Sequence, residues 1–294
     1  MKSIICFGEV LWDMLPAGKK LGGAPLNVAL RAQSLGHNAS MISSIGNDDI
    51  GAELAEEILN HGGTLAHIQV NKDFATSEVL VALDEHGTAS YEIRMPCAWD
   101  NIALLEQDLE AVKKADALIY GSLVTRSDVS RKTLFALLDQ ATYSVFDVNL
   151  RPPHYSPERI LSLMKAADFV KFNDEELHEI CMHLGFHDKS LEACIRFISE
   201  QTDTDQICVT LGKDGAVLFY NKDFYYNPGY KVTVADTVGA GDSFLASIIS
   251  KLLDGVDPQG AIDFACAVGS IVASKNGANP ELSDEEILRM IGTR

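Results

Sequence analysis

The sequence predicts an α/β protein in which a mostly parallel sheet is covered by helices on both faces. Short apolar runs of strand type alternate with longer segments of helical period along most of the chain. The strand-type runs are mainly apolar, as expected for strands that are buried on both faces of a sheet. The 294 residues are 47% hydrophobic and 22% charged, which is enough for one large domain with a sizeable core.

The predicted elements follow one another in a regular order. Runs rich in Ile, Val and Phe, bounded by Gly, Asn or Asp, predict strands at 3–7, 39–45, 115–120, 143–148, 168–172 and 206–211. Segments with the helical period lie between them, at 25–35, 49–61, 105–113, 127–141, 156–166, 174–184 and 190–200. After residue 241 the pattern becomes wholly helical, over 241–254, 258–274 and 283–292.

Residues 64–95 interrupt this alternation. They contain the strand-like segments "SEVLVAL" and "ASYEIRM", joined by "DEHGT", which is a hairpin signal with Gly at the turn. The helix-poor segment 10–23 could pair with them. We therefore predict a small β-sheet lid, formed by about 11–23 and 64–98 and inserted in a single domain of residues 1–294. The "SEVLVAL" strand is apolar on both faces, so we expect it to meet a second surface in a homodimer formed through the lid.

The excess of acidic residues bears on which kinds of molecule the protein binds. Asp and Glu number 42 against 24 Lys and Arg, a formal charge of −18, which argues against nucleic acid or an anionic membrane as the main partner. An anionic small ligand needs only a local positive field. The first residues are too acidic for a signal peptide, and no stretch approaches a transmembrane span. The six cysteines form no CxxC, so we expect a cytoplasmic protein with reduced thiols.

The segment "DTVGAGDSF" (236–244) places Gly239, Ala240 and Gly241 before one acid, Asp242, at the start of a predicted helix. The uncovered N–H groups of such a turn and the helix dipole together form an anion site. A carboxylate there is stabilised as the ion, so we expect Asp242 to be a weak, permanently charged base. A weak base suffices for phosphoryl transfer. The alternative is a Gly-rich turn with Asp as a helix N-cap, and the residues alone leave both open.

A second glycine-rich entry to a helix is "GGAPLNVAL" (22–30), with Pro25 suited to the first turn. Asn27 projects from that turn, where it either contacts a ligand or faces solvent. Other motif templates fail, because the chain has no GxxxxGK[ST] or GxSxG and "GAGDSF" lacks the third Gly of the dinucleotide fingerprint. His178 and His183 are five residues apart, so they cannot share one metal on one helix face.

These two stretches resemble the two signature segments of the ribokinase family of carbohydrate kinases, Gly-Gly-x-x-x-Asn and Asp-Thr-x-Gly-Ala-Gly-Asp. The similarity runs essentially from end to end. The resemblance implies a ribokinase-like three-layer α/β/α fold with a small lid, a sugar and ATP as ligands, and Mg²⁺ as a cofactor. It also implies that Asp242 activates the attacking hydroxyl while the amides of 239–241 hold the transferring phosphate.

The resemblance assigns further residues to the sugar. Asp13, at the end of "GEVLWD", would accept hydrogen bonds from sugar hydroxyls, and Gly23 and Asn27 would complete these contacts. Arg151 in "DVNLR" (147–151) resembles an arginine that clamps substrate or phosphate, and it follows a strand at the edge where open α/β sheets bind ligands. The alternatives are a surface acid for Asp13 and an ordinary ion pair for Arg151.

Other matching positions lie on the nucleotide side. Asn173 and Glu176 match an Asn-x-x-Glu element that supports Mg²⁺ and phosphate through water, and the same letters also fit a capping box. The segment 209–219 resembles the loop beneath the nucleotide, with the candidate contacts Thr210, Gly212 and Gly215.

Two late segments complete the nucleotide side of the resemblance. Residues 269–278, which include Asn276, resemble the helix and loop that flank adenine. Asp236 and the loop around Gly277 could hold a monovalent cation such as K⁺, as in many relatives.

The substrate is the least determined part of the prediction. "GGAP" and "DVNLR" look most like fructokinases and 2-keto-3-deoxygluconate kinases. A sugar acid requires cations, and Arg94 and Arg126 are available. The lid sequence "IRMPCAWD" (93–100) departs from the Gly-Ser-Ala pattern of keto-deoxygluconate kinases, which favours a neutral sugar and a fructokinase.

Four alternatives to a fructokinase stay open. Two are a 2-keto-3-deoxygluconate kinase and another sugar or nucleoside kinase of the family. A third is a catalytically inactive, sugar- or nucleotide-binding regulatory relative, against which the intact turn before Asp242 counts. The fourth is a nicotinamide oxidoreductase, against which the failed dinucleotide fingerprint counts.

Overall fold

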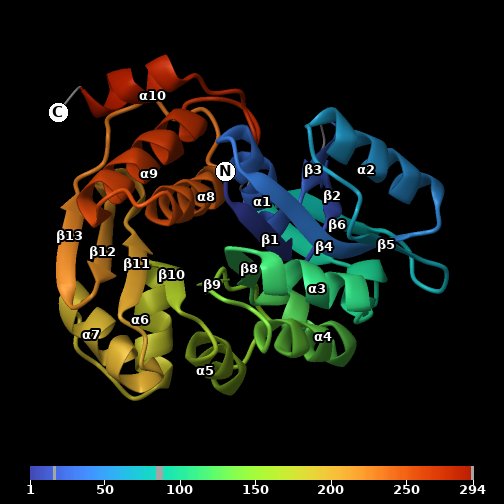
Figure 1. Ribbon diagram of the computed structural model, residues 1–294, viewed down its shortest axis with the longest axis horizontal. Helices are drawn as coiled ribbons and strands as arrows, with labels where there is room; N and C mark the ends of the chain where they lie inside the picture. Colours follow the sequence, from blue (N-terminus) through green and yellow to red (C-terminus); the bar gives the residue numbers. More distant parts are fainter. Residues whose placement is uncertain (16–17, 84–88, 293–294) are drawn as a thin grey trace.

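The protein is organised around one large sheet and one small sheet (Figure 1). A computed structural model describes residues 1–15, 18–83 and 89–292. The large sheet has the order β13-β12-β11-β10-β9-β8-β1-β4-β5, parallel from β11 to β5 and antiparallel at β12 and β13. Its strands are β1 (Ser3–Phe7), β4 (Asn38–Gly46), β5 (Ile68–Asn71), β8 (Ala117–Gly121), β9 (Ser144–Asp147), β10 (Phe169–Asn173), β11 (Gln206–Thr210), β12 (Ala216–Tyr220) and β13 (Asp223–Asn227).

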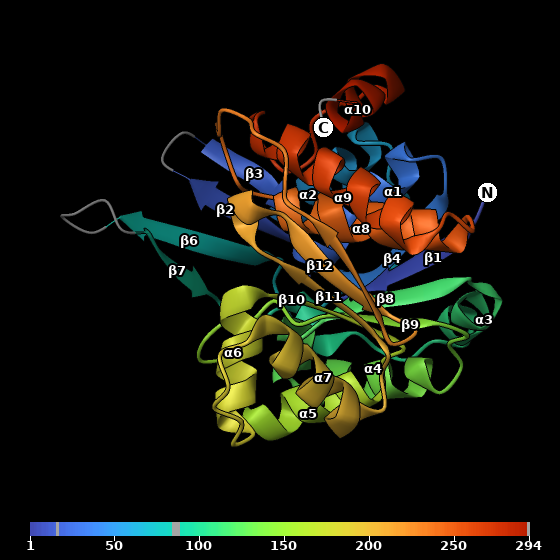
Figure 2. The same cartoon turned by 90° about the vertical axis from the view of Figure 1, so that its left-hand side faces the viewer.

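Helices cover both faces of this sheet, as predicted (Figure 2). One layer contains α1 (Ala24–Ser34), α8 (Ala240–Leu253), α9 (Pro258–Ala273) and α10 (Asp284–Ile291). The opposite layer contains α3 (Glu106–Lys114), α4 (Asp128–Leu138), α5 (Pro157–Lys165), α6 (Asp174–His183) and α7 (Leu191–Thr202). Helix α2 (Asp49–Asn60) lies beside the small sheet. Both faces of the inner strands are therefore buried, which explains their continuous apolar runs.

The predicted strands and helices begin and end within three residues of the observed ones. Strands β5, β12 and β13 were not predicted as strands of this sheet. The sequence of β12, "AVLFY", falls largely within the segment 209–219 that was interpreted as the loop beneath the nucleotide. Strands β5 and β13 lie at the edges of the sheet, where only one side has a neighbouring strand, and their sequences "IQVN" and "DFYYN" are partly exposed. An edge strand lacks the two-sided apolar pattern on which the prediction depended.

The small sheet has the order β3-β2-β6-β7, with β2 (Leu11–Leu15), β3 (Gly18–Gly22), β6 (Ser77–Leu83) and β7 (Ala89–Ile93). All four strands come from the two segments predicted to form the lid. Residues 68–71, which we also placed in the lid, instead pair with β4 in the large sheet. The predicted turn 84–88 lies outside the described residues, as do the side chains of 80–92 that would test the second apolar face of "SEVLVAL".

The two faces of the small sheet have different neighbours. Trp12 lies on one face, where its indole nitrogen donates to the carbonyl of Ile50 at 3.1 Å and so packs this face against α2. Asp13 lies on the other face and is opposite Lys20 in the strand pairing. The ammonium of Lys20 is 3.9 Å from Asp236 Oδ2. The face that carries Asp13 is therefore turned toward the segment that precedes α8.

Arg126 fastens the end of the small sheet to the large one. Its guanidinium forms a buried bidentate pair with Asp100, at 2.7 and 2.8 Å. It also donates to the carbonyls of Ile93 and Arg94, at 3.3 and 2.6 Å, and lies 4.1 Å from the ring centroid of Trp99. Ile93 ends β7, so this one side chain holds the chain where it leaves the small sheet.

We expect Arg126→Met to destabilise the protein strongly. The change leaves the carboxylate of Asp100 buried, with 1% of its surface exposed, and without its cation. Loss of one partner of a buried pair costs about 3–5 kcal/mol, which denaturant unfolding would measure.

The matched control is Arg289→Met, which breaks an exposed pair with Glu285 and should cost less than about 1 kcal/mol. Equally small losses in the two variants would contradict the anchoring role of Arg126.

Candidate active site

The site lies where the central strands of the large sheet end. The chain passes from β1 to β4 on one side and later returns to β8 on the other side, which makes a switch point between β1 and β8. Open α/β sheets bind ligands outside the carboxyl ends of strands at such a point. A small cavity of about 10 Å³ opens there, lined by Gly121, Asp147 and Asn149 together with residues of α1 and α8.

Helix α8 begins at this edge with the glycine-rich turn. Gly239 precedes the helix with φ of 74°, and a Cβ at this position would lie 2.5 Å from the Cα of Ala278. Only glycine fits, because the backbone is left-handed and the neighbouring loop is in contact. Ala240 and Gly241 open the first turn. The N–H of Ala240 donates to the carbonyl of Thr237 at 3.3 Å, and the N–H groups that follow it lack intrahelical acceptors and can bind an anion. Asp242 lies in this same turn.

Asp242 does not cap the helix, because the N-cap is Gly239, which makes no side-chain cap. Its carboxylate instead accepts a hydrogen bond from Asn27 Nδ2 at 2.8 Å. Burial, with a smaller contribution from Asp147, raises the pKa of Asp242 to about 6, against the lowering effects of Asn27, Lys171 and Arg151. The predicted weak, permanently charged base is therefore wrong. Burial outweighs the helix dipole and produces a stronger base that titrates closer to neutral pH.

Lys171 is a buried charged residue of this site that sequence reasoning missed. It lies within β10, is 6% exposed, and pairs in register with Asp147 of β9, whose Oδ1 is 2.8 Å from the ammonium. Burial would lower the pKa of Lys171, but the charges of Asp147, Glu176 and Asp242 raise it overall. A Cβ on Gly241 would be 3.7 Å from Nζ, so the ammonium lies beside the start of α8. One signal for it was available in the sequence, a lysine within a predicted buried strand. A lysine is almost never fully buried unless it is paired, so this position indicated a buried ion pair.

Glu9 is a second residue that the prediction did not use. It follows β1, is 3% exposed, and its Oε2 has no hydrogen-bond partner among the described residues. Burial raises the pKa of Glu9 to about 7, and the charge of Asp242 adds to this while Arg151 and Arg126 oppose it. A buried acid with an unmet oxygen thus lies within the field of Asp242.

The predicted sugar residues gather around the same edge. Asn27 is buried on α1, and Gly23 precedes α1 with φ of 114°, where a Cβ would meet the carbonyl of Glu9. Burial raises the pKa of Asp13, and Arg151 opposes this effect. Arg151 is exposed and donates to its neighbour's carbonyl at 2.9 Å, and its charge also acts on Glu9. The structure brings these side chains to one region.

Arg94 lies outside this region, and Arg126 reaches it only through the effect of its charge on Glu9. Because Ile93 pairs with Val79, Arg94 lies opposite Glu78, and the two side chains form an ion pair at 3.1 Å. Glu78 pairs with Trp12, so Arg94 shares the face turned away from Asp13. The guanidinium of Arg126 donates its hydrogen bonds to Asp100 and to the carbonyls of Ile93 and Arg94. The strand register thus places Arg94 on the other face of the small sheet from Asp13, and its binding of substrate stays a prediction.

The Asn173–Glu176 element forms the capping box that the sequence allowed. Asn173 Oδ1 accepts from the N–H of Glu176 at 2.8 Å, and Glu176 Oε2 accepts from the N–H of Asn173 at 2.9 Å. The other oxygen of Glu176 accepts from the N–H of Leu150 at 2.9 Å. Burial raises the pKa of Glu176, and the charge of Lys171 opposes the effect. This acid thus joins the end of β10 to the segment that follows β9.

The remaining predicted positions lie on loops at the ends of β11 and α9. Thr210 ends β11, and Gly212 and Gly215 flank a short turn before β12. Asn276 is exposed in the loop after α9.

The structure brings Asp236 and Gly277 together. Asp236 accepts from the N–H groups of Val238 and Gly277, at 3.0 and 3.2 Å. The ammonium of Lys20, on the small sheet, supplies positive charge at 3.9 Å. Within 1–15, 18–83 and 89–292, no group of three or more His, Cys, Asp or Glu is arranged to hold a metal.

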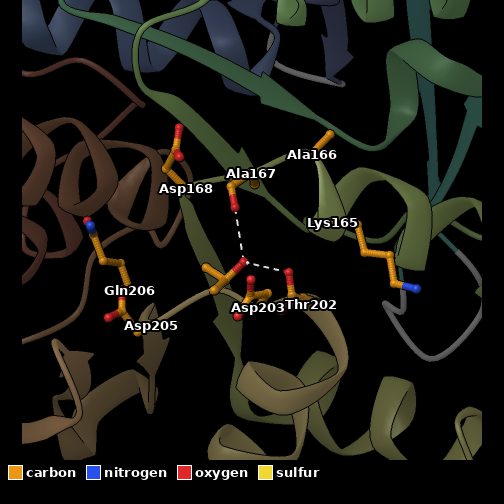
Figure 3. Close-up of a pocket in the computed structure, with 9 residues that line it drawn as sticks. Lys165, Ala166, Ala167, Asp168, Thr202, Asp203, Asp205 and Gln206 are labelled. Carbon is orange, nitrogen blue, oxygen red and sulfur yellow. Dashed lines mark hydrogen bonds between the residues drawn. The ribbon is translucent and has the colours of Figure 1, made fainter.

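A larger cavity of about 310 Å³ lies elsewhere (Figure 3). Its lining residues are 165–168 and 202–206. Asp168 precedes β10 and Asp205 precedes β11, so this cavity is at the amino ends of the strands. Asp242 is at their carboxyl ends, and the two sites are therefore separate.

Comparisons with known proteins agree on one family. The family model described as pfkB family carbohydrate kinase matches residues 4–285. Fructokinase-1 of Oryza sativa subsp. japonica is 30% identical over 319 residues, which cover 98% of this chain and 97% of the relative. The family model and this relative thus indicate the same class of enzyme, a carbohydrate kinase.

Two solved structures are similar over nearly their whole length. Fructokinase with bound ATP from Xylella fastidiosa has a TM-score of 0.85 at 25% identity, covering 99% and 98% of the two chains. Fructokinase from Vibrio cholerae O395, in a fructose, ADP and calcium ion bound form, has a TM-score of 0.84 at 25% identity, covering 99% of each chain. In the part of this chain that is described, no helix has the length and apolar character needed to cross a membrane.

We expect Lys171→Met to destabilise the protein more at pH 8 than at pH 5.5. Without the ammonium, the pKa values of Glu176 and Asp242, which burial already raises, rise further, and the carboxylate of Asp147 is left buried without its cation. Acids shifted in this direction cost stability as pH rises through the folded pKa, and protonation relieves the cost at low pH. Denaturant unfolding should show a loss of about 3–5 kcal/mol at pH 8.

Lys114→Met is the control, since it removes an exposed lysine paired with Glu110 on one helix and should cost about 0.3–0.5 kcal/mol. A loss in Lys171→Met that is the same at both pH values would show that the ammonium does not compensate buried carboxylates.

Proposed function

The chain belongs to the pfkB family of carbohydrate kinases and is an ATP-dependent sugar kinase, and we propose that its sugar is D-fructose, phosphorylated on a primary hydroxyl to give fructose 6-phosphate. One observation carries the chemical part of this proposal. Asp242 lies half-buried in the first turn of α8, beside the N–H groups that open this helix and near the ammonium of Lys171. A base, an anion site and a compensating cation therefore occupy one place.

Asp242 acts as the general base. With a pKa of about 6 it is mostly ionised at neutral pH, and it takes the proton of the attacking hydroxyl. The hydroxyl oxygen forms a bond to the γ-phosphorus of ATP while the bond between that phosphorus and the β-phosphate oxygen breaks, and ADP leaves. The N–H groups at Gly239–Gly241 stabilise the negative charge on the transferring group.

Lys171 keeps this arrangement ionised. Three carboxylates, those of Asp147, Glu176 and Asp242, act on its ammonium, and only Asp147 is within hydrogen-bond distance. We assign Lys171 the role of compensating the buried negative charge, so that Asp242 can lose its proton near neutral pH.

The nucleotide side fits a magnesium ion that is held mainly by phosphates and water. Both oxygens of Glu176 accept backbone N–H groups, which leaves this acid suited to contact an ion through water, with Asn173 beside it. Mg²⁺, when bound, would neutralise charge on the ATP phosphates. We assign the nucleotide to the loop residues Thr210, Gly212, Gly215 and Asn276.

We assign a monovalent cation such as K⁺ to the surroundings of Asp236 and Gly277. The contact between these two residues supports this site, and the ammonium of Lys20 lies 3.9 Å from Asp236.

A neutral sugar suits the described side chains better than a sugar acid. Arg126 is occupied by Asp100, and Arg94 is turned to the far face of the small sheet. We assign Asp13, Gly23 and Asn27 to sugar contacts and Arg151 to substrate or phosphate. The small sheet acts as a lid that excludes water, which would otherwise accept the phosphoryl group.

We also propose that two copies associate through the lid and that the protein acts in the cytoplasm. The apolar "SEVLVAL" sequence supports the first proposal, and sedimentation equilibrium would test it. The six cysteines are buried free thiols, which fits a reducing compartment.

The test is a coupled ADP-release assay with Mg-ATP across fructose, 2-keto-3-deoxygluconate, ribose and adenosine. We expect turnover with fructose, and a loss of about 10²–10⁴ in Asp242→Asn, because that is the usual contribution of a positioned base. Asp284→Asn changes an exposed acid in the first turn of α10 and should leave turnover unchanged.

Turnover with the keto-acid alone would overturn the assignment of fructose and direct attention to Arg151 as a carboxylate ligand. Binding of ATP without turnover of any of the four would favour an inactive relative.

A further inference from the structure

Asn27 lies between the catalytic base and the loop of residues 274–283, which follows α9. Its Nδ2 donates to Asp242 Oδ2 at 2.8 Å, and its Oδ1 accepts from Asn279 Nδ2 at 2.8 Å. Asn27 is 5% exposed, so water has little access to its amide. An ionised carboxylate can only accept and an amide nitrogen can only donate. The two partners together therefore fix which end of the Asn27 amide faces Asp242.

The same arrangement is repeated one helical turn later. Arg31 is 2% exposed, and its Nε donates to the hydroxyl of Ser243 at 3.1 Å while its Nη2 donates to the carbonyl of Pro280 at 2.9 Å. Positions four apart on a helix lie on one face. Helix α1 thus connects two successive residues of α8 to two successive residues of the 274–283 loop. The loop cannot shift along α8 without breaking both connections.

The 274–283 loop is also in direct contact with the anion turn. Ala278 lies against Gly239 so closely that a Cβ on this glycine would not fit. Gly277 donates to Asp236, in the segment that leads into the turn. The side chain of Asn279 is therefore held near the reacting groups, although no contact with a substrate is required of it.

The position of Asn279 leaves one of its polar atoms without a hydrogen bond to any described residue. Its Oδ1 is buried and has no hydrogen-bond partner among the described residues. An unmet buried acceptor is unfavourable, and such groups are rare in native proteins. The side chain is held in this position by its donor end, which engages Asn27.

We propose that Asn279 is a positioning residue for the catalytic base, which it serves by holding the Asn27 amide with its nitrogen toward Asp242. This inference rests on the proposed kinase function and adds a residue of the nucleotide-side loop to the control of the base. It predicts that a side chain without contact to the sugar changes the pH at which the enzyme becomes active.

The physical reason lies in the two orientations of Asn27. With its nitrogen toward Asp242, the amide stabilises the carboxylate and lowers its pKa. Turned by half a rotation, its carbonyl oxygen would face the carboxylate and disfavour the ion. Without Asn279, nothing on the loop side selects the first orientation.

The other charged groups that face Asp242 stay in place when Asn279 is changed. Asp147 from β9 raises its pKa, and Lys171 from β10 and Arg151 lower it. Glu9, after β1, is a further acid in the same field. A difference in the pKa of Asp242 between the native protein and an Asn279 variant therefore reports on the Asn27 amide and not on these charged groups.

The test compares the native protein with Asn279→Leu, which keeps the volume and removes the donor, and with Asn279→Ala in case the leucine variant does not fold. Two readouts are used: the pH dependence of kcat/KM for the sugar, and ¹³C NMR titration of carboxyl-labelled aspartate, with Asp242 assigned by its absence in Asp242→Asn. We expect both to shift upward by about one pH unit. At a pH well above the pKa of Asp242, where kcat/KM no longer changes with the ionisation of this residue, kcat/KM of the variants should stay within about twofold of the native value.

Two further variants make the result specific. Asn27→Leu should shift the titration of Asp242 in the same direction. Adding Asn279→Leu to this variant should produce no further shift, because Asn279 acts on Asp242 only through Asn27. Glu281→Gln changes an exposed side chain of the same loop and should shift nothing.

The outcomes separate this inference from the proposed function. A shifted NMR titration without turnover of any sugar would support the inference while the kinase assignment fails. Normal turnover with an unshifted Asp242 in Asn279→Leu would overturn the inference alone. An equal loss of activity at every pH, or a raised KM for ATP with no shift, would also overturn it, because Asn279 would then serve packing or nucleotide binding.

Discussion

A carboxylate that takes a proton from a sugar hydroxyl must be shielded from water and still be ionised near neutral pH. These requirements oppose each other, because burial favours the neutral acid. At Asp242 burial raises the pKa to about 6, and Asn27, Lys171 and Arg151 limit the rise. Each of the three comes from a different part of the chain, so the ionisation of one group depends on how the whole fold is assembled.

The parallel sheet makes this assembly possible. The strands β1, β9 and β10 end at one edge, and the side chains of neighbouring strands meet there in register. Lys171 is tolerated inside β10 because Asp147 of β9 lies directly beside it. Glu176 then ties the end of β10 to Leu150 through a backbone N–H group. The charges that the chemistry needs are thus also contacts between adjacent segments of the fold.

Local signals in the sequence predicted what depends on local structure. The helix limits, the capping box at Asn173 and the glycine turn before Asp242 are all set by neighbouring residues, and these features were predicted. The bond between Asn27 and Asp242 joins residues 215 positions apart, and no local pattern contains it. The face on which Arg94 lies depends on strand register, which no local pattern contains either. The pKa of Asp242 was misjudged for a similar reason, since burial is a property of the assembled core.

The most direct test of the account is the structure of the protein with fructose and a non-hydrolysable ATP analogue. The account predicts a primary hydroxyl oxygen within about 2.6–3.2 Å of the Asp242 carboxylate, and the terminal phosphate on the N–H groups of Gly239–Gly241. A hydroxyl bound instead to Glu9 or Asp13, with Asp242 facing no substrate atom, would contradict it. So would a terminal phosphate that lies away from the start of α8.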